Sequence, residues 1–280
     1  MSAPSPLRRL PRPRIRRRVR PRFKGPSFNR LIPNLLTMLG LCSGLTGMRF
    51  ALDGRYGAAA VAILVAAVID GLDGRIARLL KAVSRFGAEF DSLADFLCFG
   101  VAPAFTLYLW SLDAAGGIGF IPCLLFVVCM ALRLARFNAA LDSAPRPAYA
   151  YNFFTGVPAP AGAGLALFPL FVWLEARALG VDWLTALMRF PLVPAFVLIG
   201  TALLCISTLP IWSFKNFKVP AEYVLPLLLG TGAFAAVLVA EPWAALAAAG
   251  LLYLGLLPFS VRSFRRLKRE AEMTGPEPVE

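Results

Sequence analysis

The sequence predicts an all-α protein, a polytopic membrane bundle of about eight transmembrane helices. Of its 280 residues, 58% are hydrophobic and 16% are charged, a balance typical of chains that cross a membrane several times. The apolar residues gather in runs of roughly 20 residues, the length that a helix needs to cross about 30 Å of hydrocarbon. The predicted spans are 31–52, 56–74, 88–112, 117–138, 153–174, 188–209, 222–240 and 243–261.

Lysine and arginine predict which side of the membrane each connection faces. Of the 29 basic residues, 25 fall in the termini and in every second connection, and Arg49, Arg55, Arg177 and Arg189 fall on the other side. Because basic residues concentrate in cytoplasmic loops, both termini are expected to be cytoplasmic. The arginine-rich composition favours a bacterial protein, so the expected location is the bacterial cytoplasmic membrane.

The first 29 residues are strongly basic and rich in proline, so we expect a disordered tail. Its simplest role is to fix topology, and contact with anionic lipid headgroups is an alternative. A transit peptide is a weaker alternative because serine is scarce. Nucleic acid is not an expected partner, since no aromatic residues alternate with the charge. Residues 30–261 are expected to form one transmembrane unit, followed by a cytoplasmic tail at 262–280.

The chain has no histidine and five cysteines. Without imidazole, carboxylates are the natural groups to act as base and as metal ligand. The cysteines lie within predicted helices and have no Cys-x-x-Cys spacing, so they are expected to pack as small apolar residues rather than form disulfides or a zinc site. Small residues at Gly40, Gly44 and 156–164 predict close helix contacts.

Four aspartates in the second and third spans are the most informative feature. A carboxylate at bilayer depth costs roughly 2.5–3.5 kcal/mol, so four would cost on the order of 10 kcal/mol without compensation. On a helix, Asp70 and Asp73 differ by about 60° in azimuth, and Asp91 and Asp95 by about 40°. A cytoplasmic connection over 74–87 returns the chain antiparallel. The two pairs are therefore expected to converge on one or two hard cations, Mg²⁺ or Mn²⁺.

This arrangement favours phosphoryl-type transfer at the cytoplasmic face of the membrane. Divalent metal neutralises a diphosphate, and a remaining carboxylate can take the proton of an attacking hydroxyl. Gly74 and Ala77, with Gly71 and Gly87 nearby, leave bare backbone for a nucleotide. Proton relays and cation transporters also use intramembrane acids, but a transporter predicts acids in repeated halves, and no second half repeats these. A purely structural role leaves the insertion cost unexplained.

The spacing Asp70-x2-Asp73-Gly74-x2-Ala77-Arg78-x8-Gly87-x3-Asp91-x3-Asp95 resembles the signature of the CDP-alcohol phosphotransferase family. The resemblance implies a metal-dependent, homodimeric membrane enzyme that displaces CMP from a CDP-linked substrate with an alcohol. It implies metal ligands at Asp70, Asp73 and Asp91, and it makes Asp95 the base, with further metal contact. Asp91 and Asp95 are then the catalytic pair. The implied CDP-binding residues are Asp70, Gly74, Ala77, Arg78 and Gly87.

Stretches outside the signature are most similar to the bacterial phosphatidylserine synthase branch of the family. They are 32–37, 89–95, 99–104, 132–138, 154–161 and 207–215. The resemblance implies transfer of the phosphatidyl group of CDP-diacylglycerol to L-serine, with glycerol 3-phosphate, an inositol phosphate or choline as alternative acceptors. The carboxylate of serine needs cationic or donor groups, and the candidates are Arg133, Arg136, Asn138 and Lys215. Ordinary anchoring at the inner face is the alternative for each.

Overall fold

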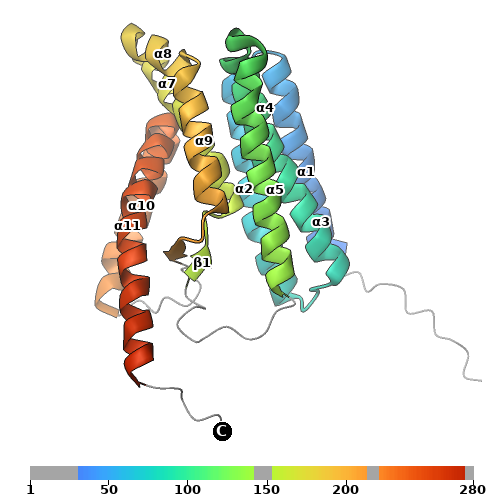
Figure 1. Cartoon of the computed structure of the whole chain (residues 1–280), viewed down its shortest axis with the longest axis vertical. Coiled ribbons are helices and arrows are strands. Elements are labelled where there is room, and N and C mark those ends of the chain that lie inside the picture. The colour runs from blue at the N-terminus through green and yellow to red at the C-terminus, as the bar shows by residue number, and fades with distance from the viewer. Residues whose placement is uncertain (1–30, 142–152, 213–220, 275–280) are drawn as a thin grey trace, which may run out of the picture.

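The computed structural model describes residues 31–141, 153–212 and 221–274, and most of these residues are helical (Figure 1). The predicted N-terminal tail and Lys215 lie outside the described residues. The elements are α1 (Leu31–Leu52), α2 (Tyr56–Leu79), α3 (Arg85–Asp95), a π-helix η2 (Phe96–Val101), α4 (Ala102–Trp110), a 3₁₀ segment η3 (Leu112–Gly119), α5 (Phe120–Leu141), β1 (Phe153–Thr155), α6 (Ala159–Ala166), α7 (Phe168–Ala178), α8 (Asp182–Arg189), α9 (Leu192–Ile206), β2 (Pro210–Trp212), α10 (Ala221–Ala240) and α11 (Pro242–Thr274).

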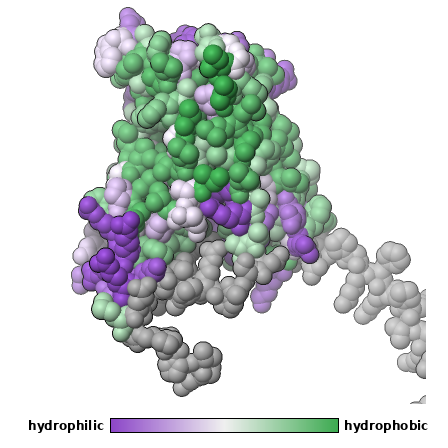
Figure 2. Space-filling model, viewed as in Figure 1, coloured by the Kyte–Doolittle hydropathy of each residue, from purple (hydrophilic) through white to green (hydrophobic). Residues whose placement is uncertain are grey.

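The described chain has the helices of a polytopic membrane protein. Six helical segments are long and apolar enough to cross a membrane, and the bent pairs α6–α7 and α8–α9 raise the number to eight. Figure 2 shows a broad hydrophobic band across the molecule, with hydrophilic residues mainly above and below it. The predicted fold class, an all-α membrane bundle with about eight spans, is confirmed.

Two of the predicted spans, 153–174 and 188–209, are bent, and the helix of the first begins later than predicted. In the predicted span 153–174, residues 153–155 form the strand β1, and the first helix of the span, α6, begins only at Ala159. The α6–α7 pair bends by 45°, where Pro169 has no N–H to donate to the preceding turn. The α8–α9 pair bends by 56° at Phe190, which has an extended ψ of 123°. Phe190 precedes Pro191, and proline disfavours a helical conformation in the residue before it.

The connection between α2 and α3 is much shorter than the predicted segment 74–87. Gly74 does not end α2, which continues to Leu79 and closes at Lys81 with a left-handed φ of 50°. There the N–H of Ala82 bonds to the carbonyl of Ala77 at 2.9 Å, a common helix end. Ser84 then caps α3 by accepting the N–H of Gly87 at 3.0 Å. This tight turn leads directly from α2 into α3, and α1 packs against both helices.

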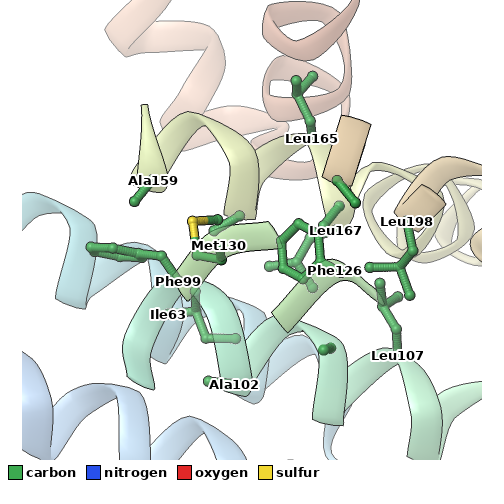
Figure 3. Close-up of a cluster of buried hydrophobic side chains, with 14 of the residues drawn as sticks. Ile63, Phe99, Ala102, Leu107, Phe126, Met130, Ala159, Leu165, Leu167 and Leu198 are labelled. Carbon is green, nitrogen blue, oxygen red and sulfur yellow. The ribbon is translucent and has the colours of Figure 1, made fainter. Parts of the chain in front are cut away.

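Glycines let α1 approach its neighbours closely. A Cβ added at Gly44 would lie 2.5 Å from Sγ of Cys98, and one at Gly40 would lie 3.4 Å from Cγ2 of Ile69. The predicted helix contact at these two glycines is confirmed. All five cysteines are free thiols, and four are buried. A larger core of buried side chains, including Ile63, Phe126 and Leu198, joins α2, α4, α5, α6 and α9 (Figure 3).

A short antiparallel ladder lies beside the lower end of the bundle in Figure 1, where β1 pairs with β2. Helix α11 anchors this ladder through Ser260. Its hydroxyl accepts the N–H of Trp212 at 2.9 Å and donates to the carbonyl of Pro210 at 2.8 Å. The ladder thereby connects the residues that follow α5 and α9 to the last helix.

Candidate active site

Three of the four aspartates meet between α2 and α3. Asp70, Asp91 and Asp95 each place one carboxylate oxygen in a group whose members all lie within 4.8 Å of one another. Asp91 and Asp95 lie one turn apart on α3, as their spacing predicts. Three carboxylate oxygens at this separation are the hard ligands that Mg²⁺ and Mn²⁺ prefer. The residues present therefore fit a divalent metal.

Asp73 lies next to this group but is held by a different helix. Its side chain is buried, with 4% of its surface exposed. The Thr37 hydroxyl on α1 donates to Oδ2 of Asp73 at 2.7 Å, and the carbonyl of Pro33 lies 3.1 Å from the same hydroxyl. Asp73 thus keeps a hydrogen-bond partner in its buried position and lines a narrow hollow together with the other three aspartates.

A cavity of about 160 Å³ opens beside Asp73 and Asp91. Its walls contain Gly74, Ala77, Arg78 and Gly87, which are four of the five residues predicted to bind CDP. The fifth, Asp70, lines the adjoining hollow. Helix α1 completes the cavity wall with Pro33, Asn34 and Thr37, which were not predicted as site residues.

The two glycines of the cavity have different structural roles. A Cβ at Gly74 would meet only Nη1 of Arg78, at 3.8 Å, so the backbone there faces open space. A Cβ at Gly87 would lie 3.0 Å from Oδ1 of Asn34 and 3.1 Å from Oγ of Ser84. The backbone at Gly74 is therefore bare, whereas Gly87 permits close packing of α1 against the start of α3.

The helix that carries Asp91 and Asp95 widens immediately after the second aspartate. In the π-helix η2, the N–H of Ala102 bonds to the carbonyl of Leu97, five residues earlier. Pro103 follows and has no N–H for the regular bond to Phe99. The missing donor gives a physical reason for the wide turn, a feature that is frequent at functional sites.

The residues predicted to bind the acceptor hold the backbone of neighbouring segments. Nε of Arg133 donates to the carbonyl of Val157 at 2.5 Å. The Arg136 guanidinium donates to the carbonyls of Ile206, Ser207 and Thr155, at 2.9, 3.0 and 3.4 Å. Both arginines also line a cavity of about 230 Å³ with Phe137, Ala140, Phe154 and Thr155. Both arginines therefore hold the backbone in place and are also exposed to an open cavity.

Asn138 has a different partner. Its Oδ1 accepts a hydrogen bond from Oγ of Ser92 at 3.1 Å, which ties the end of α5 to the residue that follows Asp91. Asn138 thus orients the aspartate-bearing helix. Thr37 and Ser92 were not among the site residues predicted from the sequence. A hydroxyl group within an apolar helix could have indicated a buried hydrogen bond. Its partner lies on another helix in each case and could not be identified from the spacing along one helix.

Residues 30–193 match the family model described as CDP-alcohol phosphatidyltransferase. The chain belongs to this family. Residues 222–258 also match the model CDP-alcohol phosphatidyltransferase 2. Membership makes the chain a membrane transferase enzyme.

Named relatives resemble most of the chain. The CDP-diacylglycerol--serine O-phosphatidyltransferase of Mycobacterium tuberculosis (strain CDC 1551 / Oshkosh) is 40% identical over 248 residues, which are 89% of this chain and 84% of the relative. The protein of the same name from Mycobacterium leprae (strain TN) is 40% identical over 253 residues, 90% of this chain and 82% of the relative. The archaetidylserine synthase of Methanothermobacter thermautotrophicus (strain ATCC 29096 / DSM 1053 / JCM 10044 / NBRC 100330 / Delta H) is 37% identical over 134 residues, 47% of this chain and 54% of the relative.

Proposed function

We propose that this phosphatidyltransferase transfers the phosphatidyl group of CDP-diacylglycerol to L-serine, giving phosphatidylserine and CMP. The observation that carries the chemistry is the convergence of Asp70, Asp91 and Asp95 beside a cavity with bare backbone at Gly74. The names of the mycobacterial relatives, which resemble nine-tenths of the chain, supply the donor and the acceptor.

We assign the metal site to Asp70, Asp91 and Asp95, with Asp73 as the further carboxylate beside them. Mg²⁺ or Mn²⁺, as one or two ions, would neutralise the diphosphate and stabilise the charge that develops on it. Thr37 restrains Asp73 through its 2.7 Å hydrogen bond. Asn138 restrains α3 next to Asp91 through Ser92. These contacts hold the acidic side chains in position before substrate binds.

The cavity lined by Gly74, Ala77, Arg78 and Gly87 is the proposed place of the CDP moiety. Arg78 is exposed on its wall and can pair with a phosphate oxygen of the nucleotide. Gly74 lets the nucleotide approach the backbone of α2, because no side chain projects there. The diacylglycerol chains can then remain in the bilayer, beside the apolar surface of the helices (Figure 2).

Asp95 is the proposed general base. It takes the hydroxyl proton of serine as that oxygen attacks the phosphorus bonded to diacylglycerol. A new bond forms between this phosphorus and the serine oxygen, and the bond to the bridging oxygen of the diphosphate breaks. CMP leaves with that oxygen and its electron pair. Asp95 lies one helical turn from Asp91 and is itself a member of the three-carboxylate group, so the proposed base lies directly at the proposed metal site.

Arg133 and Arg136 are the proposed partners of the serine carboxylate. Each already donates to backbone carbonyls, and those bonds fix the guanidinium groups at the wall of the 230 Å³ cavity. A guanidinium has five N–H donors, so donors remain for a carboxylate. Lys215 is retained as a candidate acceptor residue on sequence grounds alone.

The same proposal includes the setting of the enzyme. We infer a bacterial cytoplasmic membrane location with the active site facing the cytoplasm, supported by the distribution of basic residues. Residues 30–261 are proposed as the functional unit, acting as a homodimer as the family resemblance implies. Light scattering of the purified protein in detergent measures the oligomeric state directly.

The decisive experiment supplies purified protein with CDP-diacylglycerol, Mn²⁺ or Mg²⁺, and one labelled alcohol at a time. We expect a labelled phospholipid and CMP with L-serine. The comparison alcohols are glycerol 3-phosphate, inositol phosphate and choline. Product with one of these and none with serine would overturn the proposed acceptor while leaving the family chemistry intact. Loss of product on chelation, and its return with added metal, tests the metal requirement.

A further inference from the structure

The last helix carries a strongly basic face beyond its apolar part. In α11, basic residues follow the apolar stretch at 262, 265, 266, 268 and 269. At about 100° per residue, Arg262, Arg265, Arg266 and Arg269 fall within roughly 100° of azimuth, on one side of the helix. All four are exposed and line the same hollow of about 370 Å³ with Glu270 and Met273.

Three of the four arginines on this face have no acidic partner within the described part of the chain. Arg266 pairs with Glu270 through an exposed contact of 2.8 Å. Arg262, Arg265 and Arg269 have no carboxylate partner among the residues that the structure describes. Figure 2 shows hydrophilic residues gathered over the lower part of α11, next to the hydrophobic band. The face therefore presents unpaired guanidinium groups where the apolar surface ends.

The opposite side of α11 is docked, so the arginines have a fixed direction. The ring of Phe264 packs edge-on against Phe153 of β1, with centroids 5.1 Å apart. Ser260 is bound to both ends of β2 through Trp212 and Pro210. These contacts turn the side carrying Ser260 and Phe264 toward the ladder. The arginine face consequently points away from the protein.

We propose that this arginine face binds the phosphate-bearing headgroups of anionic phospholipids. Charge complementarity favours a lipid phosphate, because the face presents several exposed cationic groups and the phosphate is an anion. Position favours a membrane lipid, since the same helix is apolar up to the start of the arginine face. The arginines therefore lie at headgroup depth, where juxtamembrane basic clusters attract anionic lipids. This inference concerns a surface outside the proposed catalytic site and does not depend on the acceptor.

The test measures binding of fluorescent phosphatidylglycerol to the full chain in neutral detergent, by fluorescence anisotropy. The variant R262Q/R265Q/R269Q should bind at least tenfold more weakly than the unmodified chain, because three charges near the lipid are lost. The charge-conserving variant R262K/R265K/R269K should stay within about threefold of the unmodified chain. Binding of fluorescent phosphatidylcholine should be equal in all three proteins.

A matched control removes three charges from the opposite end of the bundle, in R49Q/R55Q/R177Q. It should retain phosphatidylglycerol binding within about threefold, since the basic N-terminal segment and α11 are unchanged. Equal binding by R262Q/R265Q/R269Q and the unmodified chain would overturn the proposal, as would an equal loss in the control. A measurement on the unmodified chain alone adds a second test. Raising salt from about 0.05 to 0.5 M should weaken binding, because salt screens exposed charges, and salt-independent binding would contradict the inference.

Discussion

The Thr37 hydroxyl donates to Oδ2 of Asp73 at 2.7 Å and so joins the first transmembrane helix to the acidic site on the second. Asp73 is almost fully buried, and a buried acceptor that loses its partner carries a desolvation cost of about 1–3 kcal/mol. Thr37 therefore stabilises an aspartate that is buried within an apolar bundle.

Replacing Thr37 with Val should remove this bond while keeping the shape of the side chain. We expect thermal stability in detergent to fall by the equivalent of about 1–3 kcal/mol, together with reduced turnover. Thr37→Ser retains the hydroxyl and is the matched control. If Thr37→Val melts and turns over like the unmodified protein, the Thr37–Asp73 bond has no role in the site.

Removing the charge of the proposed base should stop the reaction without unfolding the protein. Asp95→Asn is expected to lower the rate of CMP release by roughly 10²–10⁴-fold, the usual contribution of a general base. Asp91→Asn should lose activity to a similar extent, because it removes a carboxylate from the group that is proposed to bind the metal. Asp53→Asn, at an exposed position in the turn between α1 and α2, is the control. Full activity of both Asp91→Asn and Asp95→Asn would refute the assignment.

Divalent metal should stabilise the protein even when no substrate is present. A ligand at 100 times its dissociation constant stabilises the folded state by about 2.7 kcal/mol, so Mn²⁺ or Mg²⁺ should raise the thermal unfolding temperature. Asp70→Asn and Asp91→Asn should reduce this rise, because each removes a charged oxygen ligand from the three-carboxylate group. An undiminished rise in both variants would place the metal elsewhere.

Gly156 should not tolerate a side chain. Its φ is 76°, and an added Cβ would lie 2.6 Å from the carbonyl of Cys205 and 2.8 Å from that of Ser207. Left-handed backbone costs about 1–2 kcal/mol for an L-residue, and overpacking adds about 1–3 kcal/mol. Gly156→Ala should therefore lower thermal stability markedly. Gly164→Ala is the control, because no atom lies within 4 Å of the added Cβ, and equal effects would contradict this account.

The spacing of the aspartates predicted the meeting of Asp70, Asp91 and Asp95, because it depends on local geometry. Asp73 was expected to join them but accepts a hydrogen bond from Thr37 beside the group instead. Helical periodicity places Asp91 and Asp95 on one side of α3, and a tight turn returns α3 along α2. The eight spans followed equally directly, since the length of an apolar run is a property of the sequence alone. Contacts of this kind require no knowledge of distant segments.

The features that sequence reasoning missed depend on partners far along the chain. Arg136 lies 70 residues from Ile206, whose carbonyl it binds, and Thr37 lies 36 residues from Asp73. Neither partner can be chosen from periodicity. The bends at Pro169 and Pro191 could have been predicted from the sequence, because proline disrupts a helix at both positions. The short strand β1 was not, since its pairing with β2 follows from the return of the chain after α9.

The five-residue connection between α2 and α3, with Ser84 as its cap, has a consequence for biogenesis. All three members of the acidic group lie between residues 70 and 95, on two helices that are consecutive in the chain. The group can therefore assemble as a helical hairpin during cotranslational insertion, as soon as the third span follows the second into the bilayer. The helices that follow then pack around aspartates that have already come together.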